Sequence, residues 1–240
     1  MTPEVFWYGR RLTFDKAVYL RIAEELVNID LRDGRVSTQV TGDFFETLDA
    51  SFVVDSALTH WSRRFEWPWA LSTAVDRRDI VLDAGGGAGA FQFYLARRAA
   101  AVVNLDASQA MLDRTEQIAR QTDQHNLLCR HGDLAQIPYP DGHFTKVFCI
   151  SVVEHTADPA RCLEELWRVL APGGQLVLTL DVAQPANPHC HLDLNGACAL
   201  LAQRGWSVPE MRTDVIIKRY EDAPSYNLAV LCLRATKGAI

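Results

Sequence analysis

Apolar residues recur every three to four positions near the start of the chain, and from residue 79 onward they form short continuous runs between polar segments. The first pattern predicts an amphipathic helix over residues 14–29. A second helical region is expected over residues 50–64, and it leads into an aromatic cluster that Pro68 interrupts. The members of this cluster are Trp61, Phe65, Trp67 and Trp69.

The continuous apolar runs are typical of buried strands in a parallel sheet. Because these runs alternate with helical segments, they imply an α/β fold with helices on both faces of the sheet. Residues 221–226 join the last two expected strands, and this connection is too short for anything but an antiparallel pair. The first of these strands is expected to begin at residue 80. The others are expected over residues 102–105, 144–150, 175–180, 215–220 and 227–234.

Residues 80–89 read I-V-L-D-A-G-G-G-A-G, an apolar run followed by an acid and three glycines. Glycines at this point let the backbone turn tightly and approach a ligand closely. The helix expected over residues 91–98 would direct its amide-rich N-terminus toward that ligand. A free carboxylate at Asp83 disfavours a pyrophosphate and suits a cofactor that carries positive charge. The same glycines also fit a dinucleotide-binding turn, or a loop that needs glycine only for its shape.

Further acids follow later apolar runs. Asp106 ends the run at residues 102–105, at the distance from the glycine turn where an acid can bind two ribose hydroxyls. Asp133 closes the next apolar segment, where it can accept a hydrogen bond from an adenine amino group. Glu154 and His155 come shortly after the strand expected at residues 144–150. Taken together, the acids predict a site for an adenosine-containing cofactor.

In this order, the segments between residues 79 and 180 resemble the class I S-adenosylmethionine-dependent methyltransferases of the methyltransferase type 11 group, which includes quinone-biosynthesis enzymes. The resemblance implies a Rossmann-like, seven-stranded, mostly parallel sheet with helices on both faces, an antiparallel last strand and an N-terminal helical lid. It also implies that residues 1–78 form a substrate cap and that residues 79–240 bind S-adenosylmethionine and its product S-adenosylhomocysteine.

Carried over by position, Asp83 borders the methionine part of the cofactor, Asp106 holds the ribose and Asp133 lies beside the adenine. Ala107 and Met111 would cover the other face of the adenine, although ordinary core packing explains these two residues equally well. The glycine turn departs from the family at Gly86, where many members carry cysteine or serine, and the loop is expected to tolerate this. The remaining cofactor residues implied by the resemblance are Ala84, Gly85, Gly87, Leu134 and Ile150.

The implied reaction is in-line transfer of a methyl group to a small-molecule acceptor, with a hydroxyl favoured over an amine or a carbon. A hydroxyl acceptor would gain about 10² to 10⁴-fold in rate from a general base. His155 is the first candidate base and His191 the next, because both follow expected strands at the carboxyl edge, where ligands bind. Asp181 and His60 are weaker candidates. A histidine that only hydrogen-bonds its own loop is the competing interpretation of His155.

Two other functions fit parts of the pattern. An NAD(P)-dependent Rossmann oxidoreductase would use the same glycine spacing, but Asp83, Asp133 and the late antiparallel pair oppose it. A non-catalytic S-adenosylmethionine-binding protein would keep the cofactor acids and lack turnover. The sequence leaves the acceptor molecule, the acceptor atom, the oligomeric state and the role of the aromatic cluster open.

Composition limits the partners, the cellular location and the metal content that we expect of the protein. A net charge of −6 over 240 residues lacks the excess of positive charge that is typical of nucleic-acid-binding proteins. No apolar run is long enough to span a membrane, and the N-terminus has no cleavable apolar core, so a cytoplasmic location is expected. The six cysteines show no paired spacing and are expected to be buried free thiols. His189, Cys190, His191 and Asp193 lack the spacing of a metal site, and no metal is expected.

Overall fold

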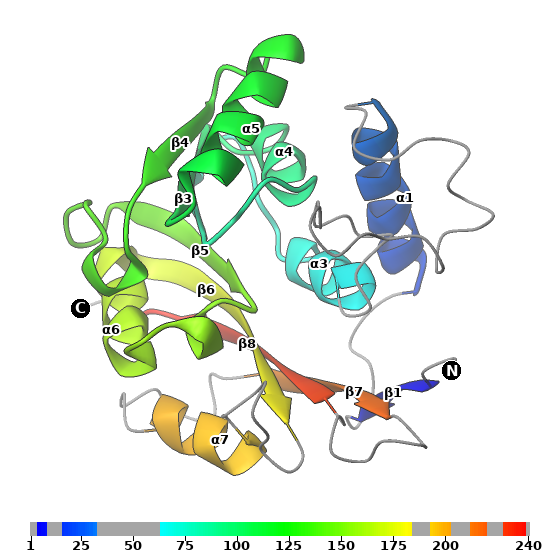
Figure 1. The fold of residues 1–240 in the computed structure, drawn as a ribbon, viewed down its shortest axis with the longest axis vertical. Coiled ribbons are helices and arrows are strands. Elements are labelled where there is room, and N and C mark those ends of the chain that lie inside the picture. The colour runs from blue at the N-terminus through cyan, green and yellow to red at the C-terminus, as the bar shows by residue number, and fades with distance from the viewer. Residues whose placement is uncertain are drawn as a thin grey trace. The chain divides into compact units, whose positions relative to one another are not determined.

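The computed structural model describes residues 4–8, 16–32, 63–183, 193–202, 212–219 and 228–238 (Figure 1). The chain divides into two compact units. One, the glycine-turn unit, is Phe14–Asp133, and the other, the C-terminal unit, joins Met1–Thr13 with Leu134–Ile240. The second helical region predicted over residues 50–64 lies almost wholly outside the described residues.

Three parallel strands form the core of the glycine-turn unit: β2 (Ile80–Ala84), β3 (Ala101–Asp106) and β4 (Leu127–His131), with β3 in the middle. Helix α4 (Phe91–Ala96) connects β2 to β3, and helix α5 (Gln109–Gln121) connects β3 to β4 (Figure 1). Parallel neighbours require such crossovers. The apolar runs that predicted β2 and β3 are buried over most of their length, as expected of strands covered on both faces.

Helix α1 (Lys16–Arg32) confirms the first predicted helix, displaced by two to three residues at each end. Its apolar stripe of Ile22, Leu26 and Ile29 is buried. Glu25 on the polar side joins α1 to the end of α4, because its carboxylate lies 2.6 Å from the guanidinium of Arg98. This ion pair fixes the N-terminal helix within the unit.

Helix α3 (Arg63–Leu71) contains Pro68 in its interior, so the proline does not end the helix as expected. The helix continues because Ser72 N donates to Pro68 O at 3.0 Å. Trp67 and Trp69 are both buried, and the Trp67 ring lies 5.6 Å from that of Phe91. These two tryptophans therefore pack against the core of their own unit.

The C-terminal unit has five strands in the order β1-β7-β8-β6-β5. Strand β5 (Phe144–Ile150) runs parallel to β6 (Leu170–Ala183), and helix α6 (Pro159–Val169) connects them. Strand β8 (Leu228–Thr236) is antiparallel to both β6 and β7 (Arg212–Arg219), which confirms the predicted antiparallel last strand. Shorter elements are η1 (Leu134–Gln136), η2 (Val153–His155) and α7 (Leu194–Ala202).

The expected count of seven strands is wrong, since the described residues contain eight. The additional strand is β1 (Glu4–Tyr8), which pairs antiparallel with β7. The sequence pattern did not reveal this strand, because its pairing with β7 joins residues near the two ends of the chain. The α/β class and the Rossmann-like arrangement of parallel strands are confirmed. An N-terminal truncation through Tyr8 would remove a strand of the sheet.

The cysteines differ from expectation at two positions. Cys149, Cys162 and Cys232 are buried free thiols, whereas Cys198 is exposed and Cys129 is half-buried. The sixth cysteine, at position 190, lies outside the described residues. Within the described part of the chain, no helix is long and apolar enough to cross a membrane.

Candidate functional site

The glycine turn, residues 83–89, begins where β2 ends. Gly85 and Gly87 have φ angles of 73° and 58°, in the left-handed region that side chains with a Cβ disfavour. Gly85 N donates to Leu105 O at 2.7 Å, which ties the turn to the neighbouring strand β3. The sequence needs glycine at these two positions for the backbone to turn back over the sheet.

Three side chains converge on the carbonyl oxygen of Gly87. Asn104 Nδ2 donates to it at 2.8 Å, Thr115 Oγ1 at 3.0 Å and Gln92 Nε2 at 3.2 Å. All three side chains are buried and come from different elements, β3, α5 and α4. Three donors directed at one buried carbonyl oxygen favour one conformation of the turn. None of these three side chains was predicted from the sequence to contact the turn.

Asp106 holds the turn from the other side. Gly87 N donates to its Oδ2 at 2.9 Å, and Ser108 N donates to its Oδ1 at 2.7 Å. A carboxylate has about four acceptor positions, so each oxygen keeps capacity for a further donor. Asp106 is therefore fixed in orientation and still able to accept hydrogen bonds from two hydroxyl groups.

Asp83 is 2% exposed at the end of β2. Burial, and to a smaller extent the charge of Asp106, raises the pKa of Asp83 to about 8, while Arg63 acts in the opposite direction. Its Oδ2 accepts no hydrogen bond from the described residues, and the same holds for Asn104 Oδ1 and Gln92 Oε1. Unpaired acceptors of this kind fit a ligand that brings positive charge and hydrogen-bond donors.

The other expected cofactor residues of this unit lie around the same strand ends. Ala84 is buried in β2, whereas Ala107 is exposed directly after β3. Met111 on α5 is 40% exposed, so it is not part of the buried core. Asp133, after β4, is exposed as well.

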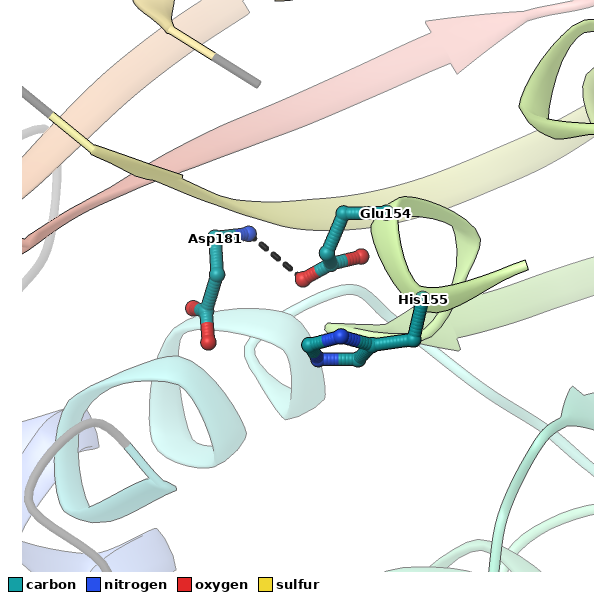
Figure 2. Close-up of side chains that lie close together, drawn as sticks. All are labelled: Glu154, His155 and Asp181. Carbon is teal, nitrogen blue, oxygen red and sulfur yellow. Dashed lines mark hydrogen bonds between the residues drawn. The ribbon is translucent and has the colours of Figure 1, made fainter. Parts of the chain in front are cut away.

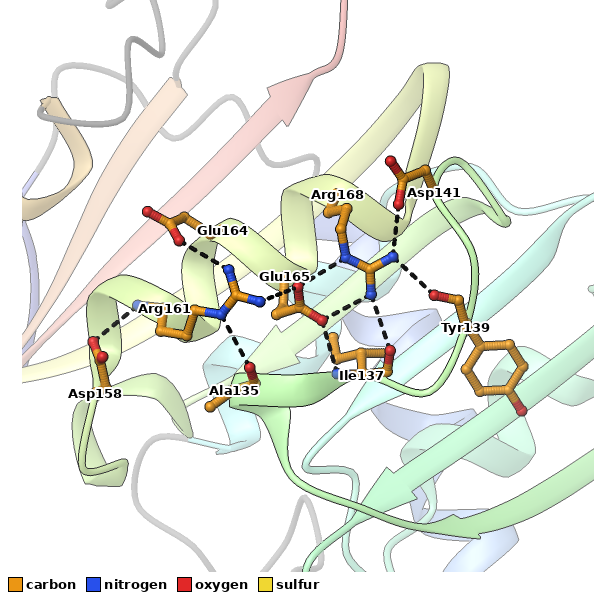
Figure 3. Close-up of polar contacts among 9 residues, drawn as sticks. All are labelled: Ala135, Ile137, Tyr139, Asp141, Asp158, Arg161, Glu164, Glu165 and Arg168. Atoms are coloured by element: carbon orange, nitrogen blue, oxygen red, sulfur yellow. Dashed lines mark hydrogen bonds and ion pairs between the residues drawn. The ribbon is translucent and has the colours of Figure 1, made fainter.

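In the C-terminal unit, Leu134 and Ile150 are buried. Figure 3 shows how the segment after Leu134 is held against helix α6. Glu165 accepts from Ile137 N at 2.9 Å and from the guanidinium of Arg168 at 2.7 and 2.8 Å. These bonds, that of Arg168 above all, lower the pKa of Glu165. Arg168 also donates to the carbonyls of Ile137 and Tyr139, so the loop that follows the expected adenine segment is fixed by main-chain contacts.

A second polar group, the Glu–His–Asp cluster of Glu154, His155 and Asp181, lies at the carboxyl ends of β5 and β6. Glu154 Oε1 accepts from Asp181 N at 2.6 Å, and the Asp181 carboxylate and the His155 ring point to the same side of β6 (Figure 2). Ser151, with a φ of 51°, donates from Oγ to Asp181 Oδ1 at 3.3 Å. A positive φ at a residue other than glycine is uncommon and frequently marks a functional site.

One carboxylate oxygen from each acid and one ring nitrogen of His155 lie within 4.8 Å of one another, and His155 is exposed. Carboxylate and imidazole groups can bind a divalent cation or transfer a proton. The sequence analysis named His155 and Asp181 as separate candidates, and the structure brings them together. The other candidate bases, His191 and His60, lie outside the described residues.

Residues 82–178 match the family model described as a methyltransferase domain. The demethylmenaquinone methyltransferase of Deinococcus radiodurans is 40% identical over 109 residues, 45% of this chain and 44% of that protein. The malonyl-acyl-carrier-protein O-methyltransferase of Serratia marcescens is 38% identical over 99 residues, 41% of this chain and 37% of that protein. The matched segments therefore span less than half the length of these two relatives.

Solved structures share the fold at low sequence identity. A methyltransferase described as putative from Bacillus halodurans superposes with a TM-score of 0.60 at 19% identity, over 72% of this chain and 99% of that one. The cyclase SpnF gives the same TM-score at 17% identity, over 72% of this chain and 81% of that one. Likeness at these identities establishes the fold alone.

The parallel strands and the glycine turn define a Rossmann-like α/β fold. The match to a methyltransferase domain covers residues 82–178, less than half of the chain, and shows a similarity over that segment.

Proposed function

We propose that this protein transfers a methyl group from S-adenosylmethionine to a small-molecule acceptor. The observation that carries the proposal is the buried Asp83 carboxyl beneath the glycine turn, with Asp106 at the end of the next strand. A positively charged ligand favours the ionised form of Asp83 and a pyrophosphate disfavours it, which argues against a nicotinamide dinucleotide. The second carboxylate retains acceptor capacity for a ribose.

Asp83, Ala84, Gly85 and Gly87 would lie along the methionine part of the cofactor, and Asp106 would accept from its ribose hydroxyls. The adenine would contact Asp133 and Leu134 on one side and Ala107 and Met111 on the other, with Ile150 completing the set. When bound, S-adenosylmethionine supplies an activated methyl group on a sulfonium. The protein then contributes alignment and exclusion of water, and alignment alone can supply about 7 to 11 kcal/mol.

For a hydroxyl acceptor, a ring nitrogen of His155 takes the hydroxyl proton as the oxygen attacks. Asp181, with an oxygen within 4.8 Å of a His155 ring nitrogen, stabilises the imidazolium that forms. Glu154 fixes the main chain of Asp181 and so keeps the two groups in register. His191 remains the second candidate for the same role.

The acceptor is proposed from the relatives as well as from the site. The two relatives described above are named for a demethylmenaquinone and for a carrier-bound malonyl group. Both are small organic groups and neither is a nucleic acid, in keeping with the acidic composition of this chain. A hydroxyl, a carboxylate and a ring carbon are the acceptor classes to test first.

Titration calorimetry with S-adenosylmethionine, S-adenosylhomocysteine and NAD(P)H tests the cofactor. We expect the first two to bind and the nicotinamide dinucleotide to give no heat. Asp106→Ala should weaken binding by about 1 to 3 kcal/mol, because the ribose hydroxyls lose a charged acceptor. Asp113→Asn, an exposed change on α5, is the matched control and should bind normally. Binding of NAD(P)H alone would overturn the proposal.

Transfer itself needs a separate assay, since SpnF shares this fold and is named as a cyclase. Labelled S-adenosylmethionine is incubated with quinol, phenol and carboxylic acid acceptors, and transfer of the label is followed by mass spectrometry. Labelled product is the expected result. Cofactor binding with no label transferred to any acceptor class would point to a protein that binds S-adenosylmethionine without methyl transfer.

A further inference from the structure

Two buried oxygen atoms beneath the glycine turn lie close to the position that a Cβ on Gly86 would occupy. Asp83 Oδ2 and Asn104 Oδ1 are both shielded from solvent, and neither has a hydrogen-bond partner among the described residues. A Cβ placed on Gly86 would stand 2.6 Å from Asn104 Oδ1 and closer still to Asp83 Oδ2. The two oxygens therefore share the room that the absent side chain of Gly86 leaves.

The orientation of the Asn104 amide follows from its surroundings. Its Nδ2 donates to Gly87 O at 2.8 Å. The reverse orientation would set the amide oxygen against that carbonyl oxygen, which already accepts from Thr115 and Gln92. Asn104 must therefore present its oxygen, an acceptor, toward Asp83. An ionised Asp83 would face it with a second acceptor and a negative charge.

We propose that Asp83 and Asn104 form a proton-holding pair in the free protein, and that the proton leaves when a positively charged ligand binds at the glycine turn. The proton resides on Asp83 Oδ2, where the O–H donates to Asn104 Oδ1. On binding, the O–H bond breaks, the carboxylate keeps the electron pair and the proton passes to the buffer.

The charged groups around Asp83 favour this arrangement. Asp106, at the end of β3, adds a second negative charge and disfavours ionisation of Asp83. Arg63 of α3 favours ionisation, but its guanidinium lies 2.6 Å from the buried carboxylate of Glu66, which offsets its charge. From α4 and α5, Gln92 and Thr115 contribute only neutral groups. The balance agrees with the raised pKa of Asp83, about 8.

The identity of the ligand in this inference rests on the proposed function. S-adenosylmethionine carries a sulfonium charge that S-adenosylhomocysteine lacks, so the two compounds separate the effect of that charge from the effect of filling the site. A positive charge nearby lowers the pKa of a carboxyl group. More proton release is expected with the sulfonium compound than with its product.

The first experiment needs no ligand. The free protein is labelled with ¹³C at its aspartate carboxyls, and Asp83 is assigned by comparison with Asp83→Asn. We expect the Asp83 resonance to titrate several pH units above the range of ordinary aspartates. Titration of Asp83 in the range of ordinary aspartates would overturn the proton-holding pair, whether or not the protein is a methyltransferase.

The second experiment counts protons. Binding of S-adenosylmethionine at about pH 7 is measured by calorimetry in buffers of different ionisation enthalpy. More than half a proton should be released by wild type and by Asp113→Asn, and none by Asp83→Asn. Binding without any buffer dependence would overturn the release step, whereas absence of binding would instead count against the proposed function. If Asp83→Asn does not fold, wild type above pH 9 replaces it, because Asp83 is then ionised before binding.

Discussion

The glycine turn and the Glu–His–Asp cluster both contain acidic side chains, but they differ in how far their polar side chains are buried. At the turn, Asn104, Thr115 and Gln92 are buried and bonded to one carbonyl group, so their positions leave little freedom. In the cluster, His155 is exposed and Asp181 is half-buried. A region built to hold one fixed ligand can be rigid and dry, whereas a region that exchanges protons with an acceptor must admit that acceptor.

Stability against pH gives the largest expected effect in this comparison. The ordinary pKa of 3.8 for Asp83 rises to about 8 on folding, chiefly through burial. Between these values the folded chain holds a proton that the unfolded chain has lost, so the free energy of unfolding should fall as pH rises from about 4 to about 8. The decline should amount to several kcal/mol, because one pKa unit corresponds to about 1.4 kcal/mol.

Urea unfolding across this pH range measures the effect. Asp83→Asn should flatten the profile, since an amide does not titrate. An equal decline in the free energy of unfolding of wild type and of Asp83→Asn would assign the pH dependence to other groups. The buried turn and the exposed cluster would then no longer differ in this respect.

Substitution of His155 gives the next largest effect, and it acts on rate alone. If the acceptor is a hydroxyl, His155→Ala should lower turnover by about 10²-fold and leave the affinity for S-adenosylmethionine within a few fold. Asp181→Asn should lower turnover less and alter the pH–rate profile. Full turnover with an unchanged pH profile in both variants would leave alignment and desolvation as the whole contribution of the protein.

Gly86→Ser tests the packing of the turn. Because the new Cβ would collide with Asp83 and Asn104, both side chains must move, and overpacking of this kind costs about 1 to 3 kcal/mol. Cofactor affinity should fall together with thermal stability. Gly238→Ala is the matched control, since a Cβ at that position meets no atom within 4 Å. A Gly86→Ser protein as stable and as tightly binding as wild type would contradict the geometry assigned to Asp83.

The sequence predicted features that depend on local periodicity and missed those that depend on contacts. Strand β5 and the acids at the ends of β2 and β3 follow from continuous apolar runs that stop at a polar residue. Strand β1 was missed because its pairing with β7 joins opposite ends of the chain. Pro68 was expected to interrupt the aromatic cluster, yet it lies inside helix α3 between the buried Trp67 and Trp69.

Asn104 shows where a signal was present and was not used. It is the one amide in the apolar run A-V-V-N-L-D of β3, and a polar residue in such a run must find partners once it is buried. The same reasoning applies to Glu165 and Arg168, which are three residues apart on α6 and therefore share a face of the helix. Their positions in the sequence could have marked these residues as unusual, but only the fold shows what they contact.

The smallest expected effect comes from Asp141, at the exposed end of the α6 network. Its carboxylate lies 2.8 Å from the Arg168 guanidinium, but the side chain is 81% exposed, so solvent screens the pair. Asp141→Asn should change the free energy of unfolding by less than about 0.5 kcal/mol. Glu165→Gln removes a buried charge from the same arginine and should cost distinctly more, because Arg168 then loses its principal partner. Urea unfolding of both variants decides the matter, and equal losses would mean that burial does not govern the strength of this network.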